Sequence, residues 1–518
     1  MTDVCLIFEV HQPFRLNRRF NLDLIASLRA EKEDLFELYF DRKLNRDIFD
    51  RISRECYLPA NEIILNQIDE FKRGKKPFKV AYSLSGVFID QCEMWNQDVI
   101  ESFKQLAESG CVEFLDQTYY HSLASLFDSD GSEFIEQIEL HREMMQSVFH
   151  YKPQVFENTE CIYDNRIAKI AENLGYEAII TEGIERILGW RAPNYVYKAK
   201  GSSICVLLRN YRLSDDVGFR FTSREWDQWP LTADKYAYWL AATPGQVINV
   251  FMDYETFGEH YRRESGIFEF LKWLPAEITK WDHLFFCTPR EVIKRHKPVD
   301  EIDVPENNVI SWADMERDTS AWLGNSLQRI SFNLLRELEP IAREVENKEL
   351  LKMWRYLQTS DHLYYISTKK GGPGVVHSTF NPYGGPAEAF ITYIKILSDL
   401  QSRFLIELEK PEFRYKRILR QLPAEKCFTF FYGFARSTSL TACSLYEFHS
   451  ILRSVDSDSI KFHMSRGDFE RWLVQVVGDR ELALEISSLS SIKNGESLRT
   501  KLLEKIEKRI KELENSSI

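Results

Sequence analysis

Residues 247–260 read VINVFMDYETFGEH, and this stretch decides the fold. Val247–Met252 is a short, mainly apolar run, which predicts a buried strand. The run ends directly in a series of acidic, aromatic and histidine residues that begins with Asp253. Polar side chains at the end of a buried strand are typical of an α/β protein whose functional site lies at the carboxyl ends of parallel strands.

The same pattern recurs through about the first 300 residues. Strands are predicted at Val4–Val10, Phe78–Leu84, Val112–Leu115, Gln154–Phe156, Ala178–Thr181, Ile204–Leu208, Val247–Met252 and Leu284–Cys287. Amphipathic helical patterns lie between several of them, such as Asp98–Ser109 and Asp164–Leu174, the latter closed by Gly175. This alternation predicts a parallel sheet, and the number of repeats favours a closed barrel over an open doubly wound sheet. No glycine-rich phosphate motif follows the first strand, which weighs against a dinucleotide fold.

From about residue 307 the strand patterns end and long helical patterns take over. We therefore predict a (β/α) barrel domain over residues 1–305 and a helical bundle that completes the active site over 306–405. A charged stretch with Pro411 and Pro423 predicts a linker over 406–426. Residues 427–518 are predicted to form a mostly helical C-terminal domain, whose role the sequence leaves open.

The composition is that of a globular protein with an acidic balance. Hydrophobic residues make up 44% and charged residues 28%, and the formal net charge is −12. An acidic chain predicts neither nucleic acid nor an anionic membrane as a partner. The nine cysteines are odd in number, dispersed and without a CxxC pair, which favours reduced thiols and a cytoplasmic location. We see no secretory leader and no membrane-spanning run.

Two kinds of chemistry fit the His, Glu and Asp residues that follow the predicted strands. A metal site would draw on His11, His121, Asp253, Glu255 and His260, although no HExxH or HxxEH pattern joins them. Glycoside hydrolysis would use two carboxylates, one attacking the sugar and one transferring the proton, and Glu160 and Asp253 fit these roles. Aromatic rings that could stack on sugar are Tyr163, Tyr254, Phe257 and Trp322.

Five separated segments carry a resemblance to a known family. They are His11-Gln12-Pro13, GCVEFL at 110–115, FENTE at 156–160, FMDYETFG at 251–258, and WAD at 312–314 continuing to AWLGN at 321–325. With these segments in this order, residues 1–405 resemble glycoside hydrolase family 57. The α-amylase-like branch is the most similar, because of Glu259-His260 and of QTSDH at 358–362. Residues 428–472 resemble a small helical domain of unknown function that is sometimes appended to such enzymes.

The resemblance implies an incomplete (β/α)7 barrel capped by a helical bundle, and a retaining mechanism that needs no metal or cofactor. It implies that Glu160 is the nucleophile and Asp253 the general acid/base. His11 and Glu113 would line the subsite of the sugar under attack, and Trp322 would stack there. The further candidates for orienting Asp253 or contacting substrate are Glu255, His260, Asp361 and His362.

We therefore expect an α-amylase-like hydrolase that acts on α-1,4-glucans or maltooligosaccharides. Three alternatives stay open at this stage. The first is a 4-α-glucanotransferase, in which a sugar rather than water resolves the intermediate. The second is a metal-dependent deacetylase or hydrolase on a related barrel, and the third is a catalytically idle glucan-binding or regulatory protein.

Overall fold

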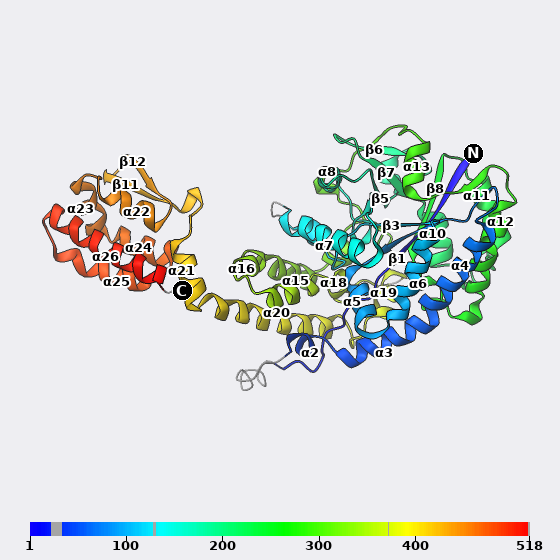
Figure 1. Ribbon diagram of the computed structural model, residues 1–518, viewed down its shortest axis with the longest axis horizontal. Coiled ribbons are helices and arrows are strands. Elements are labelled where there is room, and N and C mark those ends of the chain that lie inside the picture. The colour runs from blue at the N-terminus through cyan, green and yellow to red at the C-terminus, as the bar shows by residue number, and fades with distance from the viewer. Residues whose placement is uncertain (22–33, 128–130, 371, 516–518) are drawn as a thin grey trace. The chain divides into compact units, whose positions relative to one another are not determined.

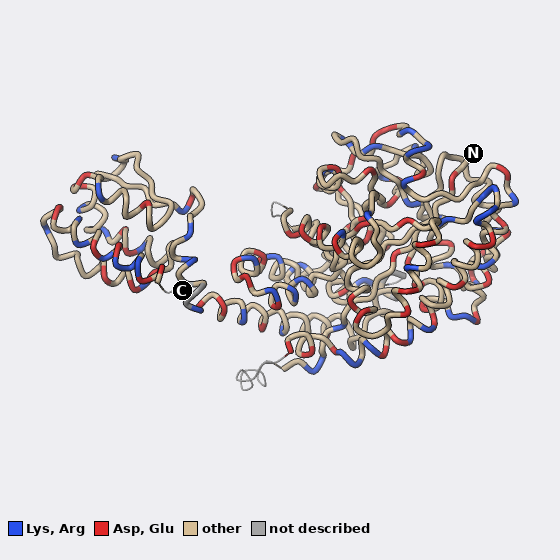
Figure 2. The backbone as a smooth tube through the Cα atoms, viewed as in Figure 1, with Lys and Arg blue, Asp and Glu red and all other residues tan. Residues whose placement is uncertain are grey.

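The computed structural model describes residues 1–21, 34–127, 131–370 and 372–515. The chain divides into two compact units (Figure 1). The first comprises Met1–Arg343 and Asn347–Leu400, and the second comprises Glu344–Glu346 and Gln401–Ile518. The region predicted as a separate helical bundle therefore belongs, up to residue 400, to the same unit as the barrel. Acidic and basic residues are interspersed along the helices of both units (Figure 2).

Every strand predicted in the first 300 residues is present within two residues of its expected bounds. The strands of this unit are β1 (Thr2–Val10), β2 (Val80–Leu84), β3 (Val112–Leu115), β4 (Val155–Glu157), β5 (Ala178–Glu182), β6 (Tyr197–Ala199), β7 (Cys205–Arg209), β8 (Val247–Asp253), β9 (Leu284–Phe286) and β10 (Glu301–Ile302). The short strands β6 and β10 were not predicted. They carry few apolar residues, and β6 is the one strand of the sheet that pairs antiparallel, with β7.

Seven strands form the barrel, and its ladder is not continuous. Parallel ladders join β8–β1–β2–β3 on one side and β4–β5–β7 on the other. The two sides meet only through single pairs, Arg209 with Asn249 between β7 and β8, and Asp116 with Phe156 beyond β3. The prediction of a closed barrel is thus wrong, because β4 is only three residues long and cannot extend a full ladder to β3. The incomplete (β/α)7 barrel implied by the resemblance is confirmed.

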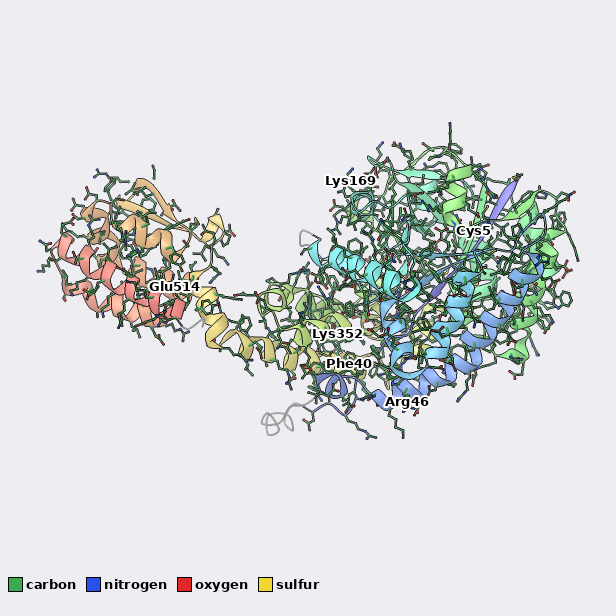
Figure 3. The ribbon with its side chains drawn as sticks, viewed as in Figure 1. Cys5, Phe40, Arg46, Lys169, Lys352 and Glu514 are labelled. Carbon is green, nitrogen blue, oxygen red and sulfur yellow. A yellow bond between two sulfur atoms is a disulfide. The ribbon has the colours of Figure 1, made fainter. Side chains whose placement is uncertain are left out.

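Alternation along each strand separates the barrel interior from the surrounding helices. On β1, Leu6 and Phe8 pack outward against helices, whereas Cys5 and Ile7 belong to the apolar interior. Cys5 is fully buried within the barrel (Figure 3). Because both faces of β1 are covered, the strand is apolar almost throughout, as expected of a central parallel strand.

Helices cover the outside of the barrel and lie between successive strands (Figure 1). They are α3 (Arg42–Ile52), α4 (Leu58–Phe71), α5 (Gly86–Trp95), α6 (Gln97–Glu108), α7 (Ser132–Phe149), α8 (Asn165–Asn173), α10 (Tyr211–Gly218), α11 (Ala233–Ala242), α12 (Ile267–Thr279) and α13 (Pro289–Arg295). The predicted stop of α8 is confirmed, since Gly175 has φ +88°, a left-handed conformation that glycine adopts without strain.

After the barrel the first unit is helical. Its helices include α14 (Ser320–Leu323), α15 (Ser326–Glu337), α16 (Glu339–Glu344), α17 (Lys348–Tyr356), α18 (Ser360–Tyr364), α19 (Gly372–Phe380) and α20 (Pro386–Leu408). Two of these helices, α14 and α15, follow each other closely. Asn325 ends the first and caps the second, because its side chain accepts the Gln328 N–H while the Gln328 side chain accepts the Asn325 N–H.

The second unit has its own hydrophobic core. It contains α21 (Pro411–Leu419), β11 (Phe428–Gly433), β12 (Arg436–Ala442), α22 (Leu445–Leu452), α23 (Ser457–Arg466), α24 (Asp468–Trp472), α25 (Arg480–Ser487) and α26 (Gly495–Asn515). Residues 406–426 do not form the predicted linker, because they continue α20 and form α21, and Ile418 and Leu422 are buried in this core.

The sequence predicts reduced thiols, but two of the cysteines are oxidised. Cys427 and Cys443, which flank the β11–β12 hairpin, form a disulfide. The antiparallel pairing of Phe428 with Ala442 places the two cysteines opposite one another, and a sequence pattern does not show this pairing. No helix in the described part of the chain combines the length and apolarity needed to cross a bilayer.

Candidate active site

A layer of polar side chains closes the carboxyl end of the barrel. Its members continue the inward-facing positions of successive strands: Glu9 after Cys5 and Ile7, Ser83 after Ala81, Glu157 after Val155, Glu182 after Ile180, Arg209 after Leu207, and Asp253 after Phe251. The ladders place Glu9 beside both Ser83 and Asp253. The layer therefore follows from strand alternation at the point where apolar residues give way to polar ones.

Glu160 stands on a strained turn just beyond β4. Glu160 and Cys161 have φ of +60° and +54°, the left-handed region that non-glycine residues rarely adopt. Hydrogen bonds hold the turn from three sides. The Cys161 N–H donates to Glu157 Oε1 (3.1 Å), the Thr181 hydroxyl donates to the Cys161 carbonyl (2.9 Å), and the Trp312 N–H donates to the Glu160 carbonyl (3.2 Å).

Two donors and one cation fix the Glu160 carboxylate. The Trp312 indole Nε1–H donates to Oε2 at 2.6 Å, and the Ser360 hydroxyl donates to Oε1 at 3.0 Å. His121 Nε2 lies 3.5 Å from Oε1. Burial opposes protonation of His121, but the carboxylates of Glu160 and Glu9 outweigh it and raise its pKa to about 9. His121 is therefore a cation at neutral pH, and it faces the carboxyl group of Glu160.

Asp253 lies at the end of β8, in the same layer. Burial and the negative charge of Glu160 raise the pKa of Asp253 to about 7, against the opposing charges of Arg209 and His121. Among the described residues, its carboxyl makes no side-chain hydrogen bond, so no donor there fixes it in the ionised form. Two carboxyl groups thus share one site: Glu160 is held by two hydrogen-bond donors and faces a cation, whereas Asp253 keeps its proton up to about neutral pH.

His11 and Asp361 form the wall beside these carboxyls. The His11 ring stacks on His121 with centroids 4.0 Å apart. Burial and the His121 cation lower the pKa of His11 to about 4, so its ring is neutral at pH 7. Its Nε2 lies 3.1 Å from the Asp361 carboxylate and its Nδ1 2.7 Å from the Ser85 hydroxyl. Because a carboxylate only accepts, Nε2 carries the hydrogen and Nδ1 accepts from Ser85.

Two further buried carboxyl pairings lie beneath the site. Burial, together with the charge of Glu157, raises the pKa of Glu9, and burial raises that of Glu157 to about 8. Glu9 Oε2 has no donor in the described structure, so a proton held between Glu9 and Glu157 supplies the missing hydrogen bond. Burial and the neighbouring Asp253 likewise raise the pKa of Glu255 to about 8, while the Tyr57 hydroxyl donates to its Oε1.

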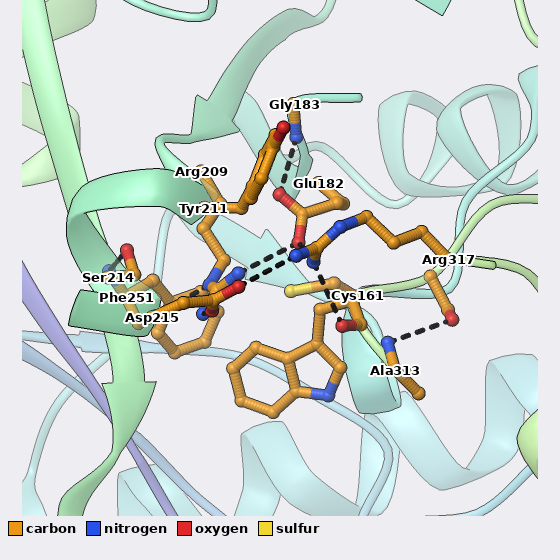
Figure 4. Close-up of polar contacts among 12 residues, drawn as sticks. Cys161, Glu182, Gly183, Arg209, Tyr211, Ser214, Asp215, Phe251, Ala313 and Arg317 are labelled. Carbon is orange, nitrogen blue, oxygen red and sulfur yellow. Dashed lines mark hydrogen bonds and ion pairs between the residues drawn. The ribbon is translucent and has the colours of Figure 1, made fainter. Parts of the chain in front are cut away.

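A closed ring of ion pairs lies beside Trp312, and Figure 4 shows its members Glu182, Arg209, Asp215 and Arg317. Glu182 accepts from Arg209 (2.9 Å) and Arg317 (2.6 Å), and Asp215 accepts from the same two residues (2.6 and 2.7 Å). Arg317 also donates to the Trp312 carbonyl at 3.2 Å, and the Arg209 guanidinium lies 5.5 Å from the centre of the Trp312 ring. With every charge paired, the ring is a rigid support for the donor to Glu160.

The structure brings together Glu160, Asp253, His11, Asp361 and Glu255 of the residues predicted from the sequence. It does not bring Glu113 to them. Glu113 lies deeper in the barrel, where its carboxylate accepts the Arg290 N–H at the start of α13, at 2.9 Å. That position places it level with Ile7 and Ala81, two residues before the polar layer, so it does not line the site.

The predictions for five other residues are corrected by burial and packing. Trp322 is fully buried and has no surface for a sugar, as is true of Tyr163, Tyr254 and Phe257. His362 points into the core, where its Nε2 lies 3.2 Å from the Tyr356 carbonyl and its ring packs near Phe40 and Tyr393. His260 is partly exposed and packs against Phe380 with ring centroids 5.0 Å apart. No hydrogen bond joins it to Asp253 within the described ranges, and contact with substrate stays a prediction.

Several residues of the site were missed by the sequence reasoning. Glu9, Glu157, Glu182 and Arg209 could have been found by extending strict alternation to the last residue of each strand. Trp312 lies in the WAD segment at 312–314, but its spacing in the sequence does not show that its indole reaches Glu160. Concerning the metal alternative, no three His, Cys, Asp or Glu side chains of residues 1–21, 34–127, 131–370 and 372–515 are arranged to hold an ion.

Comparison with known proteins agrees with this arrangement. The model of "Glycosyl hydrolase family 57" matches residues 5–305. A protein of Methanocaldococcus jannaschii named "Putative alpha-amylase" is 51% identical over 414 residues, which cover 78% of this chain and 85% of that protein.

Among solved structures, a family 57 branching enzyme from Thermococcus kodakaraensis superposes with a TM-score of 0.56 at 14% identity, covering 80% of this chain and 91% of that one. A 4-α-glucanotransferase from Thermococcus litoralis gives a TM-score of 0.51 at 15% identity, covering 83% and 61%. At these identities the likeness shows the fold alone. The matched family model and the 51% identical relative show that this chain is a glycoside hydrolase and belongs to glycosyl hydrolase family 57.

Proposed function

We propose that the protein hydrolyses α-1,4 bonds of glucans with retention of configuration, with Glu160 as the nucleophile and Asp253 as the general acid/base. The observation that carries the proposal is the contrast between two neighbouring carboxyls. Glu160 receives hydrogen bonds from Trp312 and Ser360, whereas burial and the charge of Glu160 raise the pKa of Asp253 to about 7. This is the division that retaining glycosidases need.

In the first step Glu160 attacks the anomeric carbon while Asp253 gives its proton to the leaving glycosidic oxygen. The carbon–oxygen bond to the leaving sugar breaks as the bond to Glu160 forms, which gives a glycosyl ester. The Trp312 and Ser360 donors fix the orientation of the attacking carboxylate. We expect the reacting carboxyl oxygens of Glu160 and Asp253 to be about 5–5.5 Å apart when substrate is bound.

In the second step Asp253 is a base. Ester formation removes the negative charge of Glu160, and that charge is one of the causes of the raised pKa of Asp253. The pKa of Asp253 therefore falls in the intermediate, so it is ionised when it must accept a proton from water. Water then attacks the anomeric carbon, and Glu160 leaves as a carboxylate.

The wall of the site supplies contacts for sugar hydroxyls. Asp361 is partly exposed, with 22% of its side-chain surface accessible, and it is oriented by the neutral His11. The Asp361 carboxylate can accept hydrogen bonds from a pair of sugar hydroxyls. The negative charges of Glu160, Asp253 and Asp361 act on the nearby Tyr364 hydroxyl. We propose His11, Asp361 and Tyr364 as contacts to the sugar under attack. The 51% identical relative named "Putative alpha-amylase" supports an α-glucan as substrate.

The test incubates the enzyme with maltoheptaose and follows products by chromatography and anomeric proton NMR. We expect shorter maltooligosaccharides only, released first as the α-anomer. Products both longer and shorter than the substrate would instead indicate glucan transfer, and an unchanged substrate would refute the proposal. Glu160→Gln should lower kcat at least about 10⁴-fold because no ester can form. Glu113→Gln is the matched control, since that glutamate lies outside the site and should leave kcat within about threefold.

A further inference from the structure

A cavity lies at the same rim of the barrel as the candidate active site. It has a volume of about 760 Å³ and is lined by α10, by residues 220–228, by α11 and by Met315 and Arg317. The helix α10 begins two residues after β7 ends, which places the cavity at the carboxyl end of the barrel. A volume of this size accepts a ligand of about two to four sugar rings.

The cavity and the candidate nucleophile share one structural wall. Arg317 and Asp215 line the cavity and belong to the ion-pair ring shown in Figure 4. Arg317 donates to the carbonyl of Trp312, and the Trp312 indole donates to Glu160. One residue therefore separates the cavity lining from the reacting carboxylate, so a chain bound at Glu160 and a chain bound in the cavity lie close together.

Aromatic rings give this cavity surfaces that suit a sugar. Trp226 and Trp239 both line the cavity and meet edge to face with centroids 5.9 Å apart. Arg220 lies 5.4 Å from the centre of the Trp226 ring, and Lys235 lies 5.8 Å from the centre of the Trp239 ring. Both indoles are half-buried, and Tyr211 lies in the same lining. The C–H faces of pyranose rings pack on indole rings, which provide large apolar area with little loss of conformational freedom.

The charges in the cavity select a neutral ligand. Its three arginines are each paired: Arg220 with Asp216, Arg317 with Asp215, and Arg212 with Glu185. An anionic ligand would have to displace one of these carboxylates. A neutral polyol does not, and its vicinal hydroxyls match the fixed donors and acceptors of paired guanidinium and carboxylate groups.

We propose that this cavity is an accessory binding site for α-glucan, in which Trp226 and Trp239 hold sugar rings of chains longer than those that fill the active site. The inference rests on the proposed function, because it takes its ligand from the neighbouring reaction. Its consequence is a preference for long chains. A chain anchored in the cavity gains binding free energy that a short oligosaccharide cannot reach.

The test uses Trp226→Ala in the full chain, with Trp190→Ala as the matched control, because Trp190 is 93% exposed and lies outside the cavity. We expect KM for maltoheptaose to rise about tenfold in Trp226→Ala, with kcat and the KM for maltotriose changed less than twofold. Gln228→Ala, a smaller deletion in the same lining, should raise KM for maltoheptaose in the same direction, and it serves if loss of the indole disturbs folding.

Binding measured apart from turnover separates this inference from the proposed function. In the Glu160→Gln background, calorimetric titration with maltoheptaose should show affinity that Trp226→Ala lowers about tenfold and Trp190→Ala leaves unchanged. If the wild-type enzyme cleaves glucans but Trp226→Ala and Gln228→Ala behave like wild type on maltoheptaose, the accessory site is refuted and the proposed function stands. If no glucan is cleaved but binding depends on Trp226, the proposed function fails while the cavity remains a glucan site.

Discussion

The indole of Trp312 offers the sharpest test of how the site is built. Trp312→Phe removes one hydrogen bond, from Nε1–H to Glu160 Oε2, whose length is 2.6 Å. A bond of this length to a carboxylate is charge-assisted, and losing one partner costs about 1.5–3 kcal/mol. If the bond orients the nucleophile for attack, kcat/KM falls by about 10- to 150-fold, since each 1.4 kcal/mol is a factor of ten.

Phenylalanine keeps the rest of the environment. The ring at this position packs on Phe251 with centroids 5.0 Å apart and lies beside the Arg209 guanidinium, and both contacts tolerate a smaller aromatic ring. The matched control is Trp322→Phe. Trp322 is fully buried, and its Nε1 has no hydrogen-bond partner among the described residues, so the change should cost packing but not orientation of Glu160.

The assay measures kcat and KM on maltoheptaose for both variants, together with their melting temperatures. We expect Trp322→Phe to lower the melting temperature and to keep kcat/KM within about threefold of wild type. The reasoning is refuted if Trp312→Phe also stays within threefold, or if the two variants lose the same activity. In the second case the tryptophans would act through stability alone.

Four further outcomes follow from the site and from the second unit. Because Asp253 must be protonated to act as the acid and its pKa is raised to about 7, kcat/KM should fall about tenfold per pH unit above pH 7; a rate unchanged up to pH 9 would exclude it as the acid. Glu255 has a folded-state pKa of about 8, above its unfolded value, so the unfolded state loses this proton first and stability is lost between about pH 4.3 and pH 8. Over this window Glu255 makes the unfolding free energy of the wild type fall by about 1.4 kcal/mol per pH unit, and Glu255→Gln should remove this contribution. Urea unfolding at several pH values measures the slope, and the same slope in wild type and variant would contradict the assignment. Glu157→Gln keeps the acceptor for the Cys161 N–H and should retain kcat within about threefold. Glu157→Ala removes that acceptor and should lower kcat more than tenfold with little change in KM. An equal loss of kcat in both variants would argue against a role of Glu157 in positioning Glu160. Replacing Cys427 and Cys443, which are 16 residues apart, by serine should destabilise the second unit by about 3 kcal/mol in chemical unfolding of the full chain, and an unshifted midpoint would show that the disulfide adds no stability.

Most strands of the first unit could be predicted because they depend on local patterns. Each barrel strand is a short apolar run bounded by helical periodicity, and β1 is apolar over most of its length because both of its faces are buried. Closure of the barrel could not be predicted in the same way. It depends on how many pairs the three-residue strand β4 can make with its neighbours, and a run of apolar residues does not fix its partners.

The site shows the same division between local and tertiary information. Glu160, Asp253 and His11 follow strands directly, so their position at the carboxyl end of the barrel was visible in the sequence. Glu113 and Trp322 were misplaced for different reasons. Glu113 occupies an inward position of β3 two residues before the level of the polar layer. Trp322 lies in a helix whose buried face is decided by packing with residues remote in the chain. Likewise, only tertiary structure shows that Arg317 supports Trp312.

The left-handed turn at Glu160 and Cys161 bears on how such a chain evolves. Two non-glycine residues in this conformation cost about 1–3 kcal/mol each, and glycine or asparagine at either position would relieve part of that strain. Mutation without selection on catalysis would therefore drift toward a more stable, inactive sequence. At residue 160 the less strained glycine or asparagine would also remove the carboxylate, so stability and the proposed reaction place opposite demands on this one position.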